Sequence, residues 1–274
     1  MANILDDILA VKRDEVRLAR QRVPLEDLRR QALVMPRCRN FYRTITRRNP
    51  RGINVIAEVK HASPSAGLIR EDFDHLAIAR DYHRAGADAL SVLTDEKFFQ
   101  GSLQYLTEIA QNVPLPVLRK DFIIDPYQIY EARVAGADAV LLIAEALNPG
   151  QLTDLLILAH QLTLTVLLEV HELDHLLRVR SMMGFPQARY TLLGINNRDL
   201  TTMQVDLGTS LRLADFIENK RELVSESGIR TTADVQRLIN AGFAGVLVGE
   251  TLMRQPDVAT AFAELLGQPK PQGE

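Results

Sequence analysis

The sequence predicts one α/β domain, a (β/α)8 barrel of the TIM-barrel type with an extra N-terminal helical segment. Three observations support this fold class. The chain has 274 residues, a length typical of one such barrel. Short runs rich in valine, isoleucine and leucine alternate with helical patterns, as in a parallel sheet covered by helices. The tetrapeptide Ala-Gly-Ala-Asp occurs at 85–88 and again at 135–138, which indicates a repeated structural unit.

Residues 1–50 are predicted to form a helical extension packed on the barrel. Apolar residues stand at helical spacing near the start, at Ile4, Leu5, Ile8, Leu9, Val16 and Leu18. Asn3 can cap the first turn of this helix. A shorter helix is expected to start near Pro24, which suits a first helical position, and to run to about Leu33. Residues 35–53 have the composition of an irregular connector.

Eight apolar runs follow and define the barrel, which we place at 51–267. They are Asn54–Lys60, Asp88–Thr94, Pro116–Asp121, Asp138–Ala144, Leu164–Val170, Thr191–Asn196, Glu222–Ser227 and Gly245–Gly249. An open, doubly wound sheet is the alternative, but eight strands without G-x-G-x-x-G after the first favour closure. Each Ala-Gly-Ala-Asp, and Ala-Gly-Phe-Ala-Gly at 241–245, is expected to end a helix, with glycine at the cap. The tail 268–274 is predicted to be disordered.

Composition argues against several functional classes. The formal net charge is −3, so nucleic acid is not an expected partner. No run approaches the roughly 18 apolar residues that span a bilayer. The N-terminus has acidic residues where a signal peptide has positive ones. The one cysteine, Cys38, cannot form an internal disulfide. We expect a cytoplasmic protein that has no membrane partner.

Charge is unevenly distributed along the chain. Residues 1–53 hold 13 Lys and Arg against 6 Asp and Glu, a local charge of +7, which leaves −10 for the remainder. A basic segment can raise the local concentration of an anionic substrate. Solvated helix faces and a basic loop are the simpler interpretation.

Charged side chains stand where apolar strands end. In barrels of this type the reacting groups lie at the carboxyl ends of strands. Because side chains alternate along a strand, Glu58 and Lys60 share one face and Val59 takes the other. The same alternation turns Lys120 and Glu169 inward. It also turns Asn196 inward at the end of the sixth run.

The predicted barrel mouth therefore holds two lysines and two glutamates. Opposite charges offset one another's desolvation cost. Burial and like-charge proximity are expected to lower a lysine pKa and raise a carboxylate pKa, so that both exchange protons near neutral pH. The alternative is an ion-pair network that only fills the mouth. Such networks are weak stabilisers, which favours catalysis.

Phosphate signals cluster late in the chain. Glu226-Ser-Gly228 ends the seventh strand and Val248-Gly249-Glu250 ends the eighth. Loops after these strands commonly form a phosphate site, with glycine N–H groups facing the anion. Ser63-Pro-Ser65, after the first strand, can add donors. Their joint placement is more specific than any one motif.

One segment has the sequence pattern of a metal-binding motif. His171-Glu-Leu-Asp-His175 has the H-E-x-x-H spacing of zinc proteases. That chemistry needs both histidines well inside a helix, whereas this motif begins at a strand end. Its acidic residues suit a first helical turn. We expect no metal.

With these residues in view, the sequence resembles the indole-3-glycerol phosphate synthase family. The segments that carry the resemblance are Ala57-Glu-Val-Lys60 with Ser63-Pro-Ser65, Leu93-Thr-Asp-Glu-Lys-Phe-Phe-Gln-Gly101, Leu118-Arg-Lys-Asp-Phe122, Leu168-Glu-Val-His171, Gly194-Ile-Asn-Asn-Arg-Asp-Leu200 and Glu226-Ser-Gly-Ile229. They run in order along almost the whole barrel. The resemblance implies ring closure of 1-(2-carboxyphenylamino)-1-deoxyribulose 5-phosphate to indole-3-glycerol phosphate, CO2 and water, a carboxy-lyase step of tryptophan biosynthesis.

The resemblance also implies catalytic roles. Lys120 would be the general acid that protonates the ribulose carbonyl. Lys60 would bind the anthranilate carboxylate and assist proton transfer, with Glu58 holding it. Glu169 would act as base or charge stabiliser. Which lysine donates the proton that expels water is left open.

Further roles concern substrate binding. By resemblance, Asn196 would hydrogen-bond the sugar hydroxyls, Arg198 would hold the substrate carboxylate, and Ser227 would lie beside the substrate. Phe99 and Phe122 would flank the anthranilate ring, although ordinary core aromatics are an equal alternative.

The phosphate group would be held, by the same resemblance, by Ser63, Gly228, Gly249 and the backbone of Glu250. No flavin, nicotinamide or sugar-nucleotide motif appears, so no cofactor is predicted. Association with other enzymes of the pathway stays open, as does the role of the long segment Arg180–Arg189, which we place at the amino-terminal face of the barrel.

Two other functions compete with this one. Phosphoribosylanthranilate isomerase is another phosphate-binding barrel, but it needs a cysteine and aspartate pair, and Cys38 precedes the barrel. A non-catalytic barrel that binds a phosphorylated metabolite or a partner is the second alternative. A Lys120→Met variant separates it from an enzyme, because a binding protein has no turnover to lose.

Overall fold

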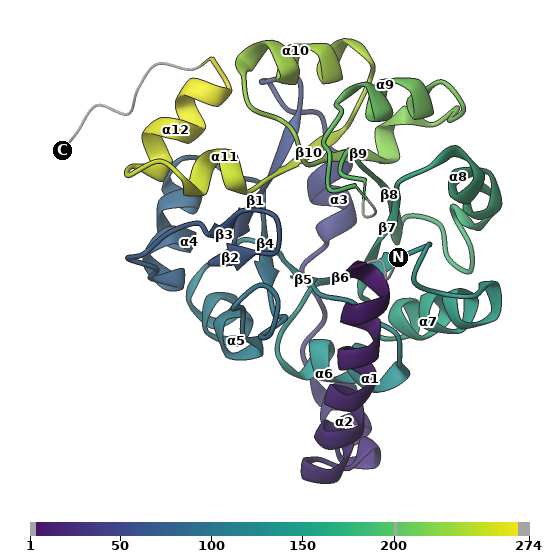
Figure 1. Ribbon diagram of the computed structural model, residues 1–274. Coiled ribbons are helices and arrows are strands. Elements are labelled where there is room, and N and C mark those ends of the chain that lie inside the picture. The colour runs from purple at the N-terminus through teal and green to yellow at the C-terminus, as the bar shows by residue number, and fades with distance from the viewer. Residues whose placement is uncertain (1–3, 200–201, 268–274) are drawn as a thin grey trace.

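The computed structural model describes residues 4–199 and 202–267. Its main sheet is a closed parallel barrel with the strand order β1-β10-β9-β8-β7-β6-β5-β4, which confirms the predicted fold class (Figure 1). The barrel strands are β1 (Asn54–Val59), β4 (Ala89–Leu93), β5 (Val117–Lys120), β6 (Ala139–Ile143), β7 (Thr165–Val170), β8 (Thr191–Asn196), β9 (Leu223–Glu226) and β10 (Gly245–Val248). Each falls within one of the eight apolar runs. A small hairpin, β2 (Ala62–Ser63) and β3 (Gly67–Leu68), follows β1.

Helices surround the barrel and cover its outer face (Figure 1). They are α1 (Ile4–Arg22), α2 (Leu25–Val34), α3 (Phe41–Thr46), α4 (His75–Arg84), α5 (Leu103–Asn112), α6 (Pro126–Val134), α7 (Pro149–Gln161), α8 (Leu173–Val179), α9 (Gly208–Ala214), α10 (Thr232–Asn240), α11 (Glu250–Met253) and α12 (Val258–Leu265), with 3-10 turns at Arg180–Met182 and Lys220–Glu222. The N-terminal helices agree with prediction except that Pro24 is the N-cap of α2 and Leu18 is 43% exposed. The proposed cap Asn3 and the tail 268–274 lie outside the described residues.

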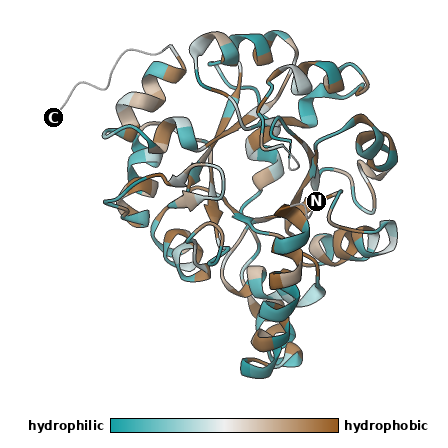
Figure 2. Ribbon diagram, in the orientation of Figure 1, coloured by the Kyte–Doolittle hydropathy of each residue, from teal (hydrophilic) through white to brown (hydrophobic). Residues whose placement is uncertain are grey.

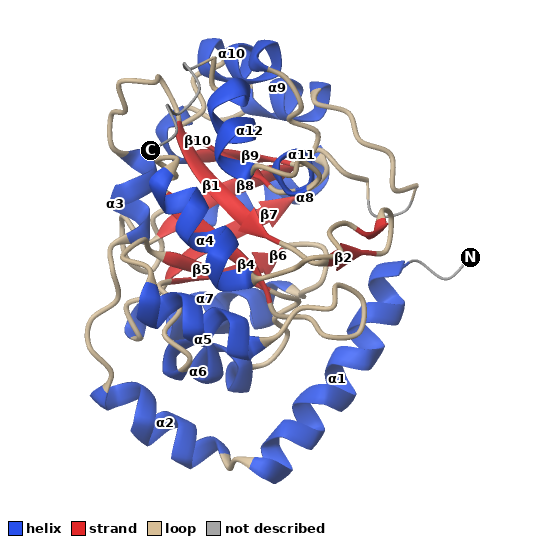
Figure 3. Ribbon diagram, turned by 90° about the vertical axis from the view of Figure 1, so that its left-hand side faces the viewer, coloured by secondary structure: helices blue, strands red, loops and turns tan. Residues whose placement is uncertain are grey.

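The prediction of an irregular connector at 35–53 was wrong in part, because α3 lies within it. Asn40 caps this helix by accepting a hydrogen bond from the backbone N–H of Arg43. Phe41 and Ile45, one helical turn apart, are fully buried and pack with the residues inside the barrel. Figure 3 shows α3 at the end of the barrel opposite the β2–β3 hairpin. The helix therefore closes the amino-terminal end.

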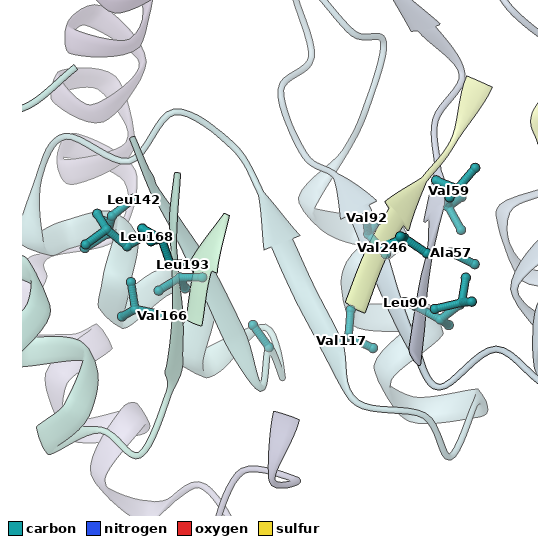
Figure 4. Packing of buried hydrophobic residues seen from close by; sticks show 14 of the residues in the cluster. Ala57, Val59, Leu90, Val92, Val117, Leu142, Val166, Leu168, Leu193 and Val246 are labelled. Atoms are coloured by element: carbon teal, nitrogen blue, oxygen red, sulfur yellow. The ribbon is translucent and has the colours of Figure 1, made fainter. Parts of the chain in front are cut away.

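The hydrophobic core has two layers because strand side chains alternate. Outward residues such as Ala57, Val166 and Leu168 pack between the strands and the helices (Figure 4). Inward residues such as Leu118 and Leu167 fill the barrel itself. Figure 2 shows that the strands are mainly hydrophobic, whereas the helices contain both hydrophobic and hydrophilic residues. Because the other inward positions are hydrophobic, a polar side chain at such a position indicates a functional or structural role.

The repeated Ala-Gly-Ala-Asp ends a helix and begins a strand, as the sequence predicted. Gly86 and Gly136 follow the C-cap residues of α4 and α6 with φ of 91° and 92°, a conformation that favours glycine. The aspartates that follow, Asp88 and Asp138, are buried. Each accepts a hydrogen bond from a backbone N–H of a neighbouring strand, and Asp88 accepts it from Val55. The repeat thus joins helix, turn and adjacent strand.

The basic N-terminal segment is attached to these same aspartates. Arg39 Nε lies 2.7 Å from Asp138 Oδ2, and Arg47 Nη2 lies 2.7 Å from Asp88 Oδ1. Arg51 Nη2 also contacts Asp88, at 2.5 Å. Several of the surplus cations are therefore partners of acidic barrel residues, a use that neither interpretation of the charge pattern anticipated.

Helix α1 lies beside the carboxyl-terminal end of the barrel (Figure 3), where Lys12 is 3% exposed. The Lys12 Nζ atom is 2.8 Å from Asp95 Oδ2 and 2.9 Å from Asp121 Oδ1. Both aspartates are buried, Asp95 after β4 and Asp121 after β5. A buried ion cluster of this kind is costly to break, since removing Lys12 leaves Asp95 without its cation and Asp121 with Arg119 alone.

We expect Lys12→Met to lower the free energy of unfolding by about 3 kcal/mol, because Asp95 and Asp121 would keep their burial and lose a cation. Chemical denaturation followed by far-UV circular dichroism measures this loss. The matched control is Arg13→Met, which removes an exposed cation from the next residue. Equal stability of the two variants would contradict the structural role of Lys12.

The same cluster predicts an acid-sensitive stability. Burial opposes the charged form of Asp121, but Arg119 and Lys12 outweigh it, and its pKa is lowered from 3.8 to about 2. A folded pKa below the unfolded one contributes stability above about pH 4 that is lost as the pH falls towards 2, here roughly 2 kcal/mol. Unfolding measured from pH 5 to pH 2 should show this loss, and Lys12→Met should reduce it.

Candidate active site

A cavity of about 450 Å³ opens at the carboxyl ends of the barrel strands. Every site residue predicted from the sequence lines it. They are Glu58, Lys60, Ser63, Phe99, Lys120, Phe122, Glu169, Asn196, Arg198, Ser227, Gly228, Gly249 and Glu250. The alternation rule works because each of β1, β5, β7 and β8 turns its last inward side chain into this space. The side chains of Ile4 and Ile8 in α1 also line the cavity.

Lys120 lies at the centre of the charged group. Its Nζ atom is 2.8 Å from Glu169 Oε2 and 3.3 Å from Glu226 Oε2. Glu169 and Glu226 are 2% and 1% exposed. The sequence interpretation missed Glu226 as a site residue, because the neighbouring Ser-Gly directed attention to phosphate. The same alternation identifies it, since Val224 faces into the barrel two residues earlier.

The pKa values in this group differ from the sequence expectation. Burial alone would lower the pKa of Lys120, but Glu169, Glu226 and Glu58 outweigh it, so this pKa is raised. Burial alone would raise the pKa of Glu169, but Lys120 and His171 outweigh it, so this pKa is lowered. The expectation of a lowered lysine and a raised carboxylate pKa was therefore wrong for both residues. The expectation did not include Glu226, which is a further carboxylate beside Lys120.

Glu226 behaves in the opposite way. Burial raises its pKa well above 4.5, and the nearby charge of Glu169 adds to burial while Lys120 opposes it. The oxygens of Glu226 accept no aligned hydrogen bond, although Lys120 lies at ion-pair distance. The pKa of Glu169 is thus lowered and that of Glu226 is raised, although both carboxyls lie near the Lys120 cation. Such a pair separates one proton acceptor from one proton donor.

A second pair lies at the end of β1. Lys60 Nζ is 2.5 Å from Glu58 Oε1, and Glu58 is 4% exposed. Gly249, after β10, leaves room for this carboxylate, because a Cβ at that position would collide with Glu58. The Lys60 side chain is 15% exposed and so can reach a ligand from the pair.

Phe99 and Phe122 form an aromatic pair at the cavity wall. Their ring centroids are 6.0 Å apart with an interplanar angle of 38°. Asp95 Oδ1 accepts hydrogen bonds from the backbone of Phe98 and Phe99, and Asp121 Oδ1 accepts one from Phe122. Both rings line the cavity, and Phe122 also packs against the residues inside the barrel.

The opposite wall is rich in polar groups from the last three strands. Ser227 and Gly228 have φ of 64° and 76°, and Asn197 Nδ2 donates to the carbonyl of Ser227 at 3.0 Å. Arg198 donates its backbone N–H to Asn196 Oδ1 at 3.0 Å, and its Nη2 lies 3.6 Å from Glu250 Oε2. This turn and Gly249 both line the cavity.

The H-E-x-x-H motif lies behind Glu169. His171 follows the end of β7, and His175 is in the first turns of α8. The described residues hold no group of three or more His, Cys, Asp or Glu arranged to bind a metal ion. Both histidines instead contact one carboxylate, that of Glu145.

Gly194 offers a way to disturb Glu226 without removing it. A Cβ at this inward position of β8 would collide with Glu226 Oε1 and would lie 3.2 Å from Leu167 Cδ1. We expect Gly194→Ala to lower kcat at least about tenfold and to cost about 1–3 kcal/mol of stability. Steady-state kinetics and thermal unfolding check both. Gly150→Ala, whose Cβ meets only Asn148 Oδ1 at 3.4 Å, is the matched control. Unchanged kcat in Gly194→Ala would argue against a role for Glu226.

Comparison with known proteins agrees with this geometry. The family model described as indole-3-glycerol phosphate synthase matches residues 5–265. A relative of that name from Rhodopirellula baltica is 50% identical over 263 residues, covering 96% of this chain and 98% of its own length. Another of that name from Polaromonas naphthalenivorans is 46% identical over 272 residues, covering 98% of this chain and 100% of its own.

Solved structures support the fold at lower identity. A crystal structure of 3-hexulose-6-phosphate synthase has a TM-score of 0.61 at 16% identity, covering 78% of this chain and 99% of its own. Thiamine phosphate pyrophosphorylase from Pyrococcus furiosus has a TM-score of 0.55 at 16% identity, covering 79% of this chain and 96% of its own.

Fold, site and relatives together define a (β/α)8-barrel carboxy-lyase that acts on a small phosphorylated substrate. Among the described residues, no helix is both long enough and apolar enough to cross a bilayer. The chain belongs to the indole-3-glycerol phosphate synthase family. Its reaction is the closure of 1-(2-carboxyphenylamino)-1-deoxyribulose 5-phosphate to indole-3-glycerol phosphate, in tryptophan biosynthesis.

Proposed function

We propose that Lys120 is the general acid of this reaction. The observation that carries the proposal is its position, buried at the barrel mouth among Glu169, Glu226 and Glu58, with its ammonium group at the cavity. Attack of an aromatic carbon on a ketone develops negative charge on the carbonyl oxygen. A preorganised cation stabilises that charge and can supply the proton.

The pair at the end of β1 is proposed to hold the substrate carboxylate. Lys60 supplies the cation, and Glu58 orients it through their 2.5 Å contact. Arg198 adds a second positive charge from the far wall of the cavity. Losing CO2 removes this negative charge, so the same lysine is then free to assist proton transfer.

Glu169 is proposed as the base that accepts the carbon-bound proton during dehydration. Its lowered pKa keeps it ionised, as a base must be. We add Glu226 to the catalytic group as a neutral carboxyl that donates a hydrogen bond beside it. This addition is supported by the raised pKa of Glu226 and its 3.3 Å approach to Lys120.

The remaining cavity residues are proposed to bind the rest of the substrate. Phe99 and Phe122 would contact the anthranilate ring through their paired faces. Asn196 would hydrogen-bond the sugar hydroxyls, and Ser227 would lie beside them. The phosphate would be bound by the hydroxyl of Ser63 and by the backbone N–H groups at Gly228, Gly249 and Glu250.

The proposal also covers the domain organisation and the cellular location. Residues 1–50 would act as an extension that helps close the barrel mouth, and 51–267 would form the catalytic domain. We place the enzyme in the cytoplasm, because its substrate is a charged sugar phosphate that does not cross a bilayer unaided.

Incubation of the purified protein with the carboxyphenylamino sugar phosphate tests the assignment. Indole absorbance and fluorescence should appear with release of CO2, and the isomerase alternative predicts neither. The phosphate site is tested by a dephosphorylated analogue. Ser63→Ala should weaken binding of the phosphorylated compound and leave that of the analogue unchanged. Equal weakening of both would place the phosphate elsewhere.

A further inference from the structure

A chain of titratable side chains leads from Glu169 away from the cavity. Glu169 Oε1 is 3.4 Å from His171 Nε2, and His171 Nδ1 is 3.2 Å from Glu145 Oε2. The other oxygen of Glu145 is 3.1 Å from His175 Nδ1. Exposed fractions of the side chains rise along the chain, from 2% at Glu169 and 6% at His171 to 13% at Glu145 and 23% at His175. One end is buried at the catalytic group and the other reaches solvent.

Local structure holds this chain in place. His171 is two residues beyond Glu169, so the strand period puts both side chains towards the same side. Ile143 is paired in register with Glu169, and the loop after β6 brings Glu145 level with His171. The backbone N–H of His171 donates to Glu145 Oε1 at 2.9 Å. His175 follows one helical turn later, at the start of α8, which places it near His171.

The family reaction creates a demand for protons. The ketone oxygen leaves as water, so it takes up two protons. One carbon-bound proton is returned to a base when the double bond of the indole forms. The carbon that loses CO2 bonds to the sugar carbon and needs no proton. A substrate that binds as a carboxylate and releases CO2 therefore consumes one proton from solvent in each turnover.

Bound substrate would occupy the cavity under Ile4 and Ile8 and obstruct the direct route for this proton. We propose that His175, Glu145 and His171 form a proton path from solvent to Glu169, behind the substrate. The path rests on the role proposed above for Glu169 as the base. Each step moves a proton between a histidine nitrogen and a carboxylate oxygen, with no other bond made or broken, and rotation of the histidine rings and of the Glu145 carboxyl group aligns successive donors and acceptors. From Glu169 the proton passes to Lys120 Nζ, 2.8 Å away, and replaces the proton that Lys120 gives to the departing oxygen.

The electrostatic surroundings suit such a path. Burial disfavours a charged His171, but Glu145 and Glu169 outweigh it, so the pKa of the imidazole is raised above 6.5. Lys120 faces it from β5 and opposes this effect. An imidazole that lies between two carboxylates can both accept and donate a proton. The ring nitrogens of His171, Nδ1 of His175 and Oε2 of Glu145 make no aligned hydrogen bond in the resting arrangement, so each transfer requires these groups to rotate.

His171→Gln tests the path, because glutamine keeps a donor and an acceptor for Glu169 and Glu145 but does not titrate. We expect kcat to fall at least about tenfold with KM changed less than about twofold. His171→Ala should be equally slow and should recover on addition of imidazole. The matched control is His75→Gln, which removes a histidine 2.6 Å from Glu108 on the outer face and should leave kcat unchanged.

The outcomes separate the path from the proposed chemistry. Wild-type kcat in His171→Gln, together with an inactive Glu169→Gln, would overturn the path and leave the base assignment intact. A slow His171→Ala that imidazole does not restore would show that the histidine only orients Glu169, and would also overturn it. Activity retained in Glu169→Gln would instead contradict the proposed function. Circular dichroism of each variant verifies that it is folded.

Discussion

Replacing Lys120 by methionine is expected to lower kcat by about 10³-fold, with a much smaller change in substrate affinity. The developing alkoxide would lose both its proton donor and the nearest positive charge. The phosphate and ring contacts lie elsewhere in the cavity and would still bind. Single-turnover measurement of indole fluorescence gives the rate, and titration with the product gives the affinity.

This variant has a structural consequence that must be separated from chemistry. Without the cation, Glu169 and Glu226 remain buried beside each other, and we expect Glu169 to take up a proton. Lys220→Met is the control, because Lys220 lies before β9, at the amino-terminal end of the barrel. A Lys120→Met protein with near wild-type kcat would refute the general-acid assignment. It would direct attention to Lys60 as the donor.

Glu169→Gln is expected to lower kcat by about 10²- to 10⁴-fold, because glutamine fills the same space but cannot accept the carbon-bound proton. It leaves Lys120 with Glu226 and Glu58 as its remaining carboxylate neighbours. We therefore also expect the pKa of Glu226 to fall, since the like charge that raises it would be gone. The pH dependence of the residual rate measures this change.

The direction of the pH effect makes the test specific. Glu169 must be ionised to act, and its pKa is lowered, so the wild-type rate should not fall as the pH drops from neutrality towards 5. Glu108→Gln is the control, since Glu108 is on the outer face with His75. If Glu169→Gln kept most of its activity, the base would have to be sought among Glu58 and Glu226.

Local patterns in the chain predicted most of the fold. The eight barrel strands follow from apolar runs, and the helix ends at Gly86 and Gly136 follow from the repeated tetrapeptide. Helix α3 was missed because Phe41 and Ile45 stand among many cations, where a short apolar face is inconspicuous. This helix is stabilised by burial against the inside of the barrel. A short segment of sequence does not show which distant residues it will contact.

The site divides in a similar way. Glu58, Lys60, Lys120 and Glu169 could be assigned from the two-residue period of their strands, because a closed barrel turns all such positions inward. Contacts between residues from distant parts of the chain could not be assigned in this way. Lys12 contacts aspartates 83 and 109 positions further along, as their residue numbers show. These contacts exist only once α1 has folded back over the barrel.

The sequence by itself determined which residues face the interior, because alternation and helical spacing are properties of a short stretch of backbone. It also contained the motifs that place the chain in its family. Only the tertiary structure decided the direction of the pKa shifts. The pKa values of Lys120 and Glu226 are raised and that of Glu169 is lowered, because four strands bring three carboxylates and one ammonium group together at the buried mouth of the barrel. Electrostatic energy depends on distance and burial in space, and neither is set by separation along the chain.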